Sequence, residues 1–170
     1  LRTQPRSLLD TFGGDCTGQP PASPFEFVLA DIAVDGVMVE NVGVRKKGFI
    51  GSLDTVRPSL KVKFGEFIDG QTLFGEKRMT LNNARQDPAR ITQCLGYQRF
   101  AAAGLPAPRC TFAHVKVTTD DNDTHDLGLY VNIDAIKSAF LERTFGSSDG
   151  NLYEGTFGAD FRPRWLGTFE

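Results

Sequence analysis

Basic residues gather between Val42 and Lys63, with a spacing that suits the binding of an anion. This window holds six basic residues and one acidic residue, Asp54. Side chains alternate along a strand, so basic residues two positions apart would share one face of a sheet. Those that would do so are Arg45 and Lys47 in one segment, and Arg57, Lys61 and Lys63, together with Ser59, in the next. If the two segments pair, several cations meet on one side of the sheet.

A loop with two glycines, residues 48–54, connects these two segments. Gly48, Gly51 and Ser52 are small, so backbone N–H groups there could approach phosphate oxygens whose charge the cations neutralise. The loop is not a Walker A motif, because no Gly-Lys-Ser/Thr ends it. We interpret the combination as a polyphosphate site. The alternative is a solvated outer face, which lysines often form on an exposed strand.

Other residue types that could carry out chemistry lack partners in the sequence. His114 and His125 have no Cys, His or Glu at ligand spacing, and Ser52 and Ser59 have no visible base. The acidic loop 120–126 lacks the Gly and terminal Glu of a calcium loop, so we interpret it as a solvated hairpin tip. We therefore predict neither a metal site nor a catalytic residue within these 170 residues.

Three cysteines, Cys16, Cys94 and Cys110, match no zinc spacing and no C-x-x-C redox motif. In an oxidising compartment a Cys94–Cys110 disulfide could form. We favour the other interpretation, in which both are buried thiols.

Composition restricts the classes of partner. Apolar residues make up 40% and charged residues 24% of the chain, which is typical of a globular protein. The 19 Lys and Arg residues are balanced by 21 Asp and Glu residues, so no global charge favours nucleic acid. No apolar run approaches the roughly 18 residues that a membrane span needs.

Strand and turn signals predict the elements that must position the basic residues. We expect residues 1–24 to be a linker or a loosely attached arm, because they are rich in Gly and Pro. Asp35-Gly36 predicts a tight hairpin between the first two strands. The expected strands are Phe25–Val34, Val37–Lys47, Arg57–Phe64, Cys110–Val117 and Leu127–Ile133, and residues 151–157 should also be extended.

Two helices are predicted among these strands. The first has Asp87 as N-cap and Pro88 in its first turn, and ends at Gly104. The second runs from about Asp134 to Phe145. Three strands, a helix, two strands and a helix predict an α+β fold, an antiparallel sheet with a crossing helix. The small lobe of a protein kinase has this arrangement, as do many other α+β domains.

Several short stretches, in one order along the chain, resemble the CotH family of spore-coat protein H kinases and their secreted relatives. The resemblance covers roughly residues 27–170. The stretches are Val42–Gly48, Pro58–Phe64, Leu81–Asn83, Asp87-Pro88, Ala103–Arg109, Gly128–Tyr130 and Gly150–Tyr153. It implies an atypical protein kinase that uses ATP and Mg²⁺, with residues 25–170 forming the N-terminal part of the kinase-like domain.

The resemblance implies roles for individual residues. The loop and the strand after it would face the ATP phosphates, and Gln93 matches the position of the helix glutamate that holds the phosphate-binding lysine in kinases. The expected nucleotide-binding residues are Arg45, Lys47, Gly48, Ser52, Arg57, Lys61, Lys63, Gln93 and Asp134. Four positions depart from the pattern of many relatives: Arg57 replaces Lys, Thr92-Gln93 replaces Arg-Glu, and Asp134 replaces Glu.

The family's catalytic and metal-binding aspartates are expected downstream of Glu170, in Asn-x-Asp and Pro-Trp-Asp-x-Asp contexts. We therefore expect these 170 residues alone to be inactive, truncated before the catalytic lobe. The expected partners are a coat or surface protein and the chain's own C-terminal lobe, and the expected location is extracytoplasmic. The alternative function is a non-catalytic adhesion or coat-assembly scaffold.

Overall fold

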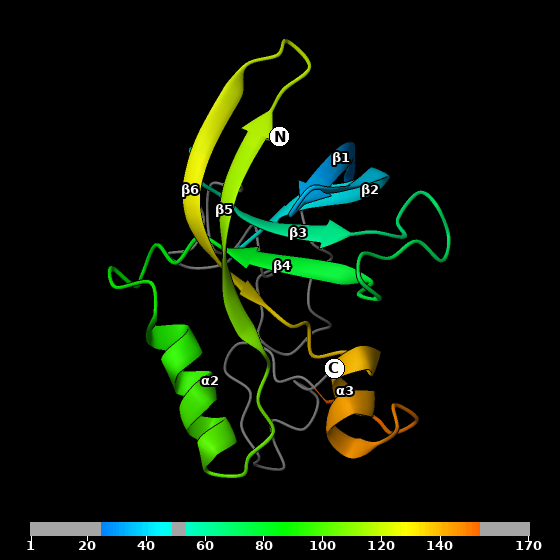
Figure 1. Ribbon diagram of the computed structural model, residues 1–170, viewed down its shortest axis with the longest axis vertical. Coiled ribbons are helices and arrows are strands. Elements are labelled where there is room, and N and C mark those ends of the chain that lie inside the picture. Colours follow the sequence, from blue (N-terminus) through cyan, green and yellow to red (C-terminus); the bar gives the residue numbers. More distant parts are fainter. Residues whose placement is uncertain (1–24, 49–53, 154–170) are drawn as a thin grey trace, which may run out of the picture.

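A single antiparallel sheet organises the protein, with a helix at each side of one end (Figure 1). The computed structural model describes residues 25–48 and 54–153. The strands are β1 (Val28–Val34), β2 (Val37–Lys47), β3 (Ser59–Lys63), β4 (Arg78–Asn82), β5 (Cys110–Thr118) and β6 (Thr124–Ile133). The helices are α2 (Thr92–Ala102) and α3 (Ser138–Phe145). The α+β class predicted from the sequence is confirmed.

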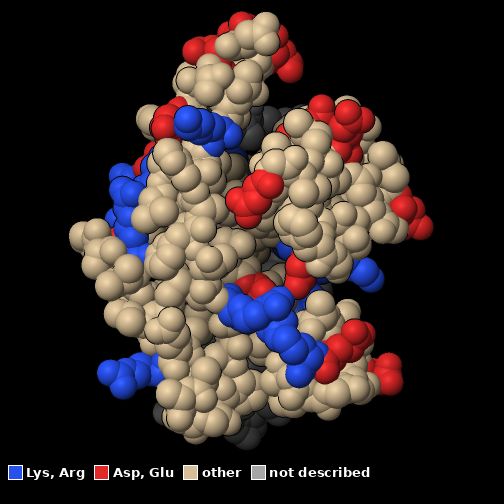
Figure 2. Space-filling model, in the orientation of Figure 1, with Lys and Arg blue, Asp and Glu red and all other residues tan. Residues whose placement is uncertain are grey.

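Strand order in the sheet is β1-β2-β3-β4-β6-β5. The first four strands form a meander, and the chain then crosses through α2 before β5 and β6 return as a hairpin, with β6 against β4. Figure 1 shows that this hairpin rises well beyond the rest of the sheet. Its tip carries Asp120, Asp121 and Asp123, and Figure 2 shows acidic side chains gathered there.

The alternation predicted for β3 is confirmed. Leu60, Val62 and Phe64 are buried on one face, where they join two apolar clusters. Lys61 and Lys63 lie on the other face and are half-buried. Because side chains of a strand alternate, burying the apolar face fixes the register and places the lysines together on the opposite side.

The sequence pattern did not predict strand β4. It is five residues long and pairs with both β3 and β6, so it is a central strand. Only Leu81 of its residues is buried. A strand with one buried apolar residue gives little periodic signal.

Both helices begin later than predicted. Arg90 has a φ of 57°, a left-handed conformation that cannot belong to an α-helix, so α2 begins at Thr92 rather than after Asp87. Lys137 is extended, and α3 therefore begins at Ser138 rather than near Asp134. The predicted end of α3 is confirmed, since Gly146 has a left-handed φ of 79° and caps the helix.

Two predicted segments fall largely outside the described residues. Residues 1–24, expected to be an arm, lie outside them entirely, and so do residues 154–157 of the last expected strand. Residues 151–153 have no regular secondary structure. Neither α2 nor α3, the helices of the described part of the chain, has the length and apolar character that a membrane-spanning helix requires.

Tyr130 connects β6 to the segment before β3. Its ring is fully buried with Leu60 and Leu81, and its hydroxyl donates a hydrogen bond of 2.9 Å to the carbonyl oxygen of Pro58. Burial raises the pKa of Tyr130 to about 12, even though the nearby charge of Arg57 acts in the opposite direction. The hydroxyl therefore stays protonated and remains a donor across the physiological pH range.

We expect Tyr130→Phe to lower the free energy of unfolding by about 1–2 kcal/mol, because the buried carbonyl of Pro58 loses its donor. Chemical denaturation would measure the change. Tyr153→Phe is the matched control, since Tyr153 is 69% exposed, and it should change stability by less than about 0.5 kcal/mol. Equal effects of the two substitutions would contradict the role assigned to the Pro58 hydrogen bond.

Candidate functional site

A cavity of about 450 Å³ opens between the end of β2, the end of β4 and the start of α2. Two of the predicted residues at the end of β2, Lys47 and Gly48, line it, and so does Gln93 from α2. The remaining lining residues come mostly from the segment that connects β4 to α2. They are Ser59, Asn82, Asn83, Ala84, Arg85, Gln86, Asp87, Thr92 and Val131.

Lys47 reaches into this cavity across strand β3. In the register of β2 with β3, Lys47 lies opposite Ser59, and its ammonium donates a 2.7 Å hydrogen bond to Asn82 Oδ1 on the following strand. The small Ser59 side chain leaves room for this path, and its hydroxyl is already used, accepting a 3.0 Å hydrogen bond from the N–H of Asn83. The ammonium is thus held at a fixed position over the sheet.

Three cations lie close together on this face. Arg45 is directly opposite Lys61 in the register of β2 with β3, and Lys47 is two residues further along β2. Burial lowers the pKa of Lys47, and the positive charges of Lys61 and Arg45 lower it further. Bringing like charges together costs free energy, which a bound anion would offset.

Arg45 also contacts the two phenylalanines that precede β1, Phe25 and Phe27. Its guanidinium lies over the ring of Phe27, 5.1 Å from the centroid, and donates a 3.3 Å hydrogen bond to the carbonyl oxygen of Phe25. Burial lowers the pKa of Arg45, while the charge of Glu66 acts against that change. Arg45 therefore contributes positive charge to the face but is packed against β1.

A carboxylate lies beside Lys63. Its ammonium forms a 2.7 Å ion pair with Glu66. Glu66 can lie against β2 because residue 43 is glycine, and a Cβ there would meet the Glu66 side chain at 2.6 Å. The carboxylate compensates the charge of Lys63, so this lysine has less to offer an anion than Lys47.

Arg57 points away from the cluster. Its guanidinium donates a 2.6 Å hydrogen bond to the carbonyl oxygen of Leu127 and another to that of Leu129, and it lies 4.8 Å from the centroid of the Tyr130 ring. These contacts tie the segment before β3 to β6. The structure thus does not bring Arg57 together with the residues predicted to face a phosphate.

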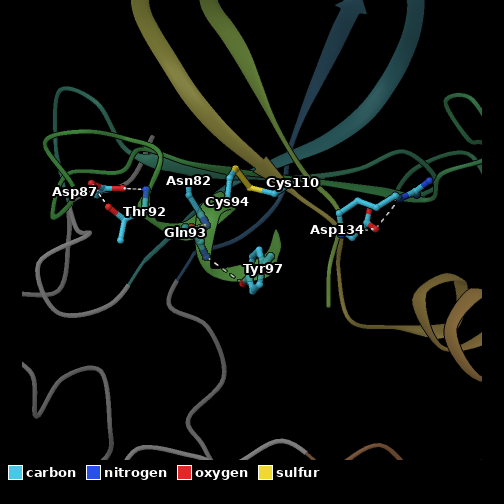
Figure 3. Close-up of a disulfide and its surroundings, with 9 residues drawn as sticks. Asn82, Asp87, Thr92, Gln93, Cys94, Tyr97, Cys110 and Asp134 are labelled. Atoms are coloured by element: carbon cyan, nitrogen blue, oxygen red, sulfur yellow. Dashed lines mark hydrogen bonds and ion pairs between the residues drawn. A yellow bond between two sulfur atoms is a disulfide. The ribbon is translucent and has the colours of Figure 1, made fainter. Parts of the chain in front are cut away.

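Asp134 also lies apart from the cavity, as Figure 3 shows by its distance along the sheet from Gln93. Its carboxylate pairs with Arg109 at 2.8 Å and with Arg143 at 2.6 Å, and Arg109 pairs in turn with Glu76 at 2.7 Å. Burial alone would raise the pKa of Asp134, but these arginines outweigh it and hold the pKa below its usual range. Figure 2 accordingly shows basic and acidic side chains side by side near α3.

Gln93 connects the cavity to α2 (Figure 3). Its Oε1 accepts a 3.2 Å hydrogen bond from Asn82 Nδ2, and its Nε2 donates a 3.2 Å hydrogen bond to the hydroxyl of Tyr97 one turn along the helix. Asn82, which the sequence did not single out as a site residue, therefore bridges Lys47 and Gln93. In the sequence, the stretch Leu81–Asn83 indicates only the family resemblance.

Side chains fix the segment from β4 to α2, and one of them, Asp87, is the residue that the sequence predicted as the helix N-cap. Asp87 accepts hydrogen bonds of 2.8 Å from both the N–H and the hydroxyl of Thr92, so it caps α2 from five residues away. Asp54 accepts a hydrogen bond from the N–H of Arg57, the main cause of its lowered pKa, and pairs with Arg85 at 3.1 Å. Ser52, the last predicted residue, lies outside the described residues.

A disulfide between Cys94 and Cys110 attaches α2 to the start of β5 (Figure 3). The interpretation of these cysteines as buried thiols is therefore wrong. Their sequence separation of 16 gave no indication of proximity, but α2 lies against Val131 and Ile133, next to the first residue of β5. Gln93 precedes the tethered cysteine, so the disulfide also holds the site residue.

These features define an α+β domain with a cavity at the start of helix α2, next to a cluster of three cations. A scan against family models matches residues 44–170 to the CotH kinase protein family. The chain belongs to this family, which confirms the resemblance. A search of curated proteins finds no match.

Removal of the disulfide by a Cys94→Ala, Cys110→Ala double substitution should lower the free energy of unfolding by about 3 kcal/mol, because the crosslink restricts the unfolded chain. Chemical denaturation of both proteins would measure this difference. Peptide mapping without reductant should recover the two cysteines in one linked peptide pair. Recovery of both as alkylated thiols would contradict the disulfide.

Proposed function

We propose that the chain supplies the nucleotide-binding face of a CotH-type protein kinase and that the cavity beside Lys47 holds the phosphates of Mg-ATP. The observation that carries this proposal is the fixed Lys47 ammonium, with its lowered pKa, beside two further cations. Half-buried positive charge at the end of a strand, next to the loop glycine Gly48, is suited to a polyphosphate. The family match supports a kinase-related activity.

Lys47 and Lys61 would neutralise phosphate oxygens, and Arg45 would add positive charge from its position against Phe25 and Phe27. Gly48 has a φ of 135°, which favours glycine, at the point where β2 ends. When bound, Mg²⁺ would supply positive charge beside the phosphates in addition to that of the lysines. The family resemblance implies that carboxylates in Asn-x-Asp and Pro-Trp-Asp-x-Asp contexts would hold the metal and orient the acceptor hydroxyl.

The arrangement of strands supports the comparison with a kinase small lobe. The crossing helix α2 precedes the β5–β6 hairpin and packs on the sheet, and its residue Gln93 faces the cavity where a kinase would place a glutamate. We propose an extracytoplasmic location, which the Cys94–Cys110 disulfide supports. A coat or surface protein is the proposed substrate.

A scaffold function in adhesion or coat assembly is the second candidate. The observation that favours it is the neutral Gln93, which contacts Asn82 and leaves the site without the lysine–glutamate pair that kinases use. An Asn-x-Asp and a Pro-Trp-Asp-x-Asp sequence in the rest of the protein would favour the kinase. Their absence there would favour the scaffold.

Lys47→Ala should weaken Mg-ATP binding roughly tenfold to a hundredfold, because one charge-assisted hydrogen bond is worth about 1.5–3 kcal/mol. Lys61→Ala should act in the same direction, and Lys63→Ala should have a smaller effect because Glu66 already pairs with Lys63. Isothermal calorimetry on the full-length protein would measure the affinities.

Lys116→Ala is the matched control, since Lys116 is an exposed lysine of the same sheet on β5, outside the cavity. It should leave the affinity unchanged. Equal affinity in all four variants and the unmodified protein would contradict the phosphate site. A full-length protein that binds no ATP would favour the scaffold.

A further inference from the structure

Four side chains form a continuous line of hydrogen bonds that begins at Lys47 and ends on α2. Lys47 Nζ donates to Asn82 Oδ1 at 2.7 Å, Asn82 Nδ2 donates to Gln93 Oε1 at 3.2 Å, and Gln93 Nε2 donates to the Tyr97 hydroxyl at 3.2 Å. The line crosses from β2 to β4 and on to α2. It connects elements that share no backbone hydrogen bonds, since β3 separates β2 from β4.

The direction of this line is set by the charge of Lys47. A lysine ammonium has donors only, so Asn82 must turn its oxygen toward Lys47 and its amide nitrogen toward Gln93. Gln93 must then present its oxygen to Asn82 and its nitrogen to Tyr97. Each amide side chain accepts a hydrogen bond through its oxygen and donates one through its nitrogen. Neither amide can therefore exchange its oxygen and nitrogen without breaking a hydrogen bond.

We propose that Asn82 is the positioning residue for Lys47, and that its neutral side chain holds the ammonium in place without compensating its charge. This inference rests on the proposed phosphate site. A carboxylate at position 82 would hold the ammonium as well, but it would neutralise the charge and repel a phosphate. An amide holds the geometry and leaves the positive charge for the ligand.

The charged groups around Lys47 are consistent with this role. Arg45 on β2 and Lys61 on β3 are both cationic and both lower the pKa of Lys47. Arg85 and Asp87, from the segment between β4 and α2, line the same cavity and carry opposite charges. Asp87 is directed to the Thr92 N–H and hydroxyl at the start of α2, and Lys47 donates to Asn82.

The decisive variant is Asn82→Asp, which keeps the shape of the side chain and adds one negative charge. The pKa of Lys47 should rise, because an opposite charge favours the ammonium form. The affinity for Mg-ATP should fall roughly tenfold or more, because the new carboxylate faces the phosphates. In the unmodified protein, the affinity for Mg-ATP should fall at alkaline pH as Lys47 loses its proton. In Asn82→Asp, this decrease in affinity should occur at a higher pH.

Asn132→Asp is the matched control. Asn132 pairs with Leu81 in the register of β4 with β6, so it lies on the face of the sheet opposite to Asn82. It should change neither the pKa of Lys47 nor the affinity. Asn82→Ser is a second variant that removes the contact without adding charge, and it should weaken binding severalfold while leaving the pKa of Lys47 at or below its original value.

Calorimetry with Mg-ATP across pH, and NMR titration of the Lys47 side chain in the free protein, would give both quantities. Unchanged affinity and unchanged Lys47 pKa in Asn82→Asp and Asn82→Ser would overturn the role of Asn82, even if Lys47→Ala abolishes binding. If the unmodified protein binds no ATP, the proposed site fails, and the NMR titration of Asn82→Asp still decides whether residue 82 controls Lys47.

Discussion

The pairing of β4 with β3 on one side and β6 on the other is the constraint on which the site depends. Backbone hydrogen bonds place Leu81 opposite both Leu60 and Asn132, so Leu81 is buried with Leu60 and Tyr130. The next residue, Asn82, must then face the other side of the sheet, toward Lys47 and α2. A shift of one residue would bury the amide, expose Leu81 and leave Lys47 without its acceptor.

The cationic face carries an electrostatic cost that the rest of the molecule tolerates. Arg45, Lys47 and Lys61 lie close together, and burial adds to the effect of like charge on the pKa of Lys47. Ion pairs compensate other charges of the described residues, since Asp134 pairs with Arg109 and Arg143, and Lys63 pairs with Glu66. Perturbed pKa values such as that of Lys47 are common at functional sites.

The sequence pattern predicted the features that depend on neighbouring residues alone, such as strand alternation and helix ends. The alternation of Leu60, Val62 and Phe64 with lysines gave the correct faces of β3, and Gly146 gave the correct end of α3. Lys47 and Gln93, both predicted as nucleotide-binding residues, line the same cavity. These features rest on strand alternation and on backbone conformations that few residues adopt.

Long-range contacts account for what the sequence could not predict. Arg57 binds carbonyl oxygens 70 and 72 residues away, and nothing in its neighbourhood distinguishes it from the lysines of β3. Asn82 acquires its role only when β4 is recognised as a strand beside α2. The helix start was misplaced because the left-handed turn at Arg90 interrupts an otherwise suitable capping sequence. Each error reflects a tertiary contact or a turn that outweighs a local preference.

Helix α2 is a weak element in itself, which explains the value of its covalent attachment. It has 11 residues, contains Gly96 and buries only Cys94, and its first N–H is capped by Asp87 rather than by its N-cap residue Ile91. Isolated helices of this length are marginal in water, and a central glycine weakens them further. The disulfide to Cys110 fixes the first turn, the turn that carries Gln93. The hydrogen-bond line from Lys47 therefore enters α2 at the turn that the disulfide attaches to β5.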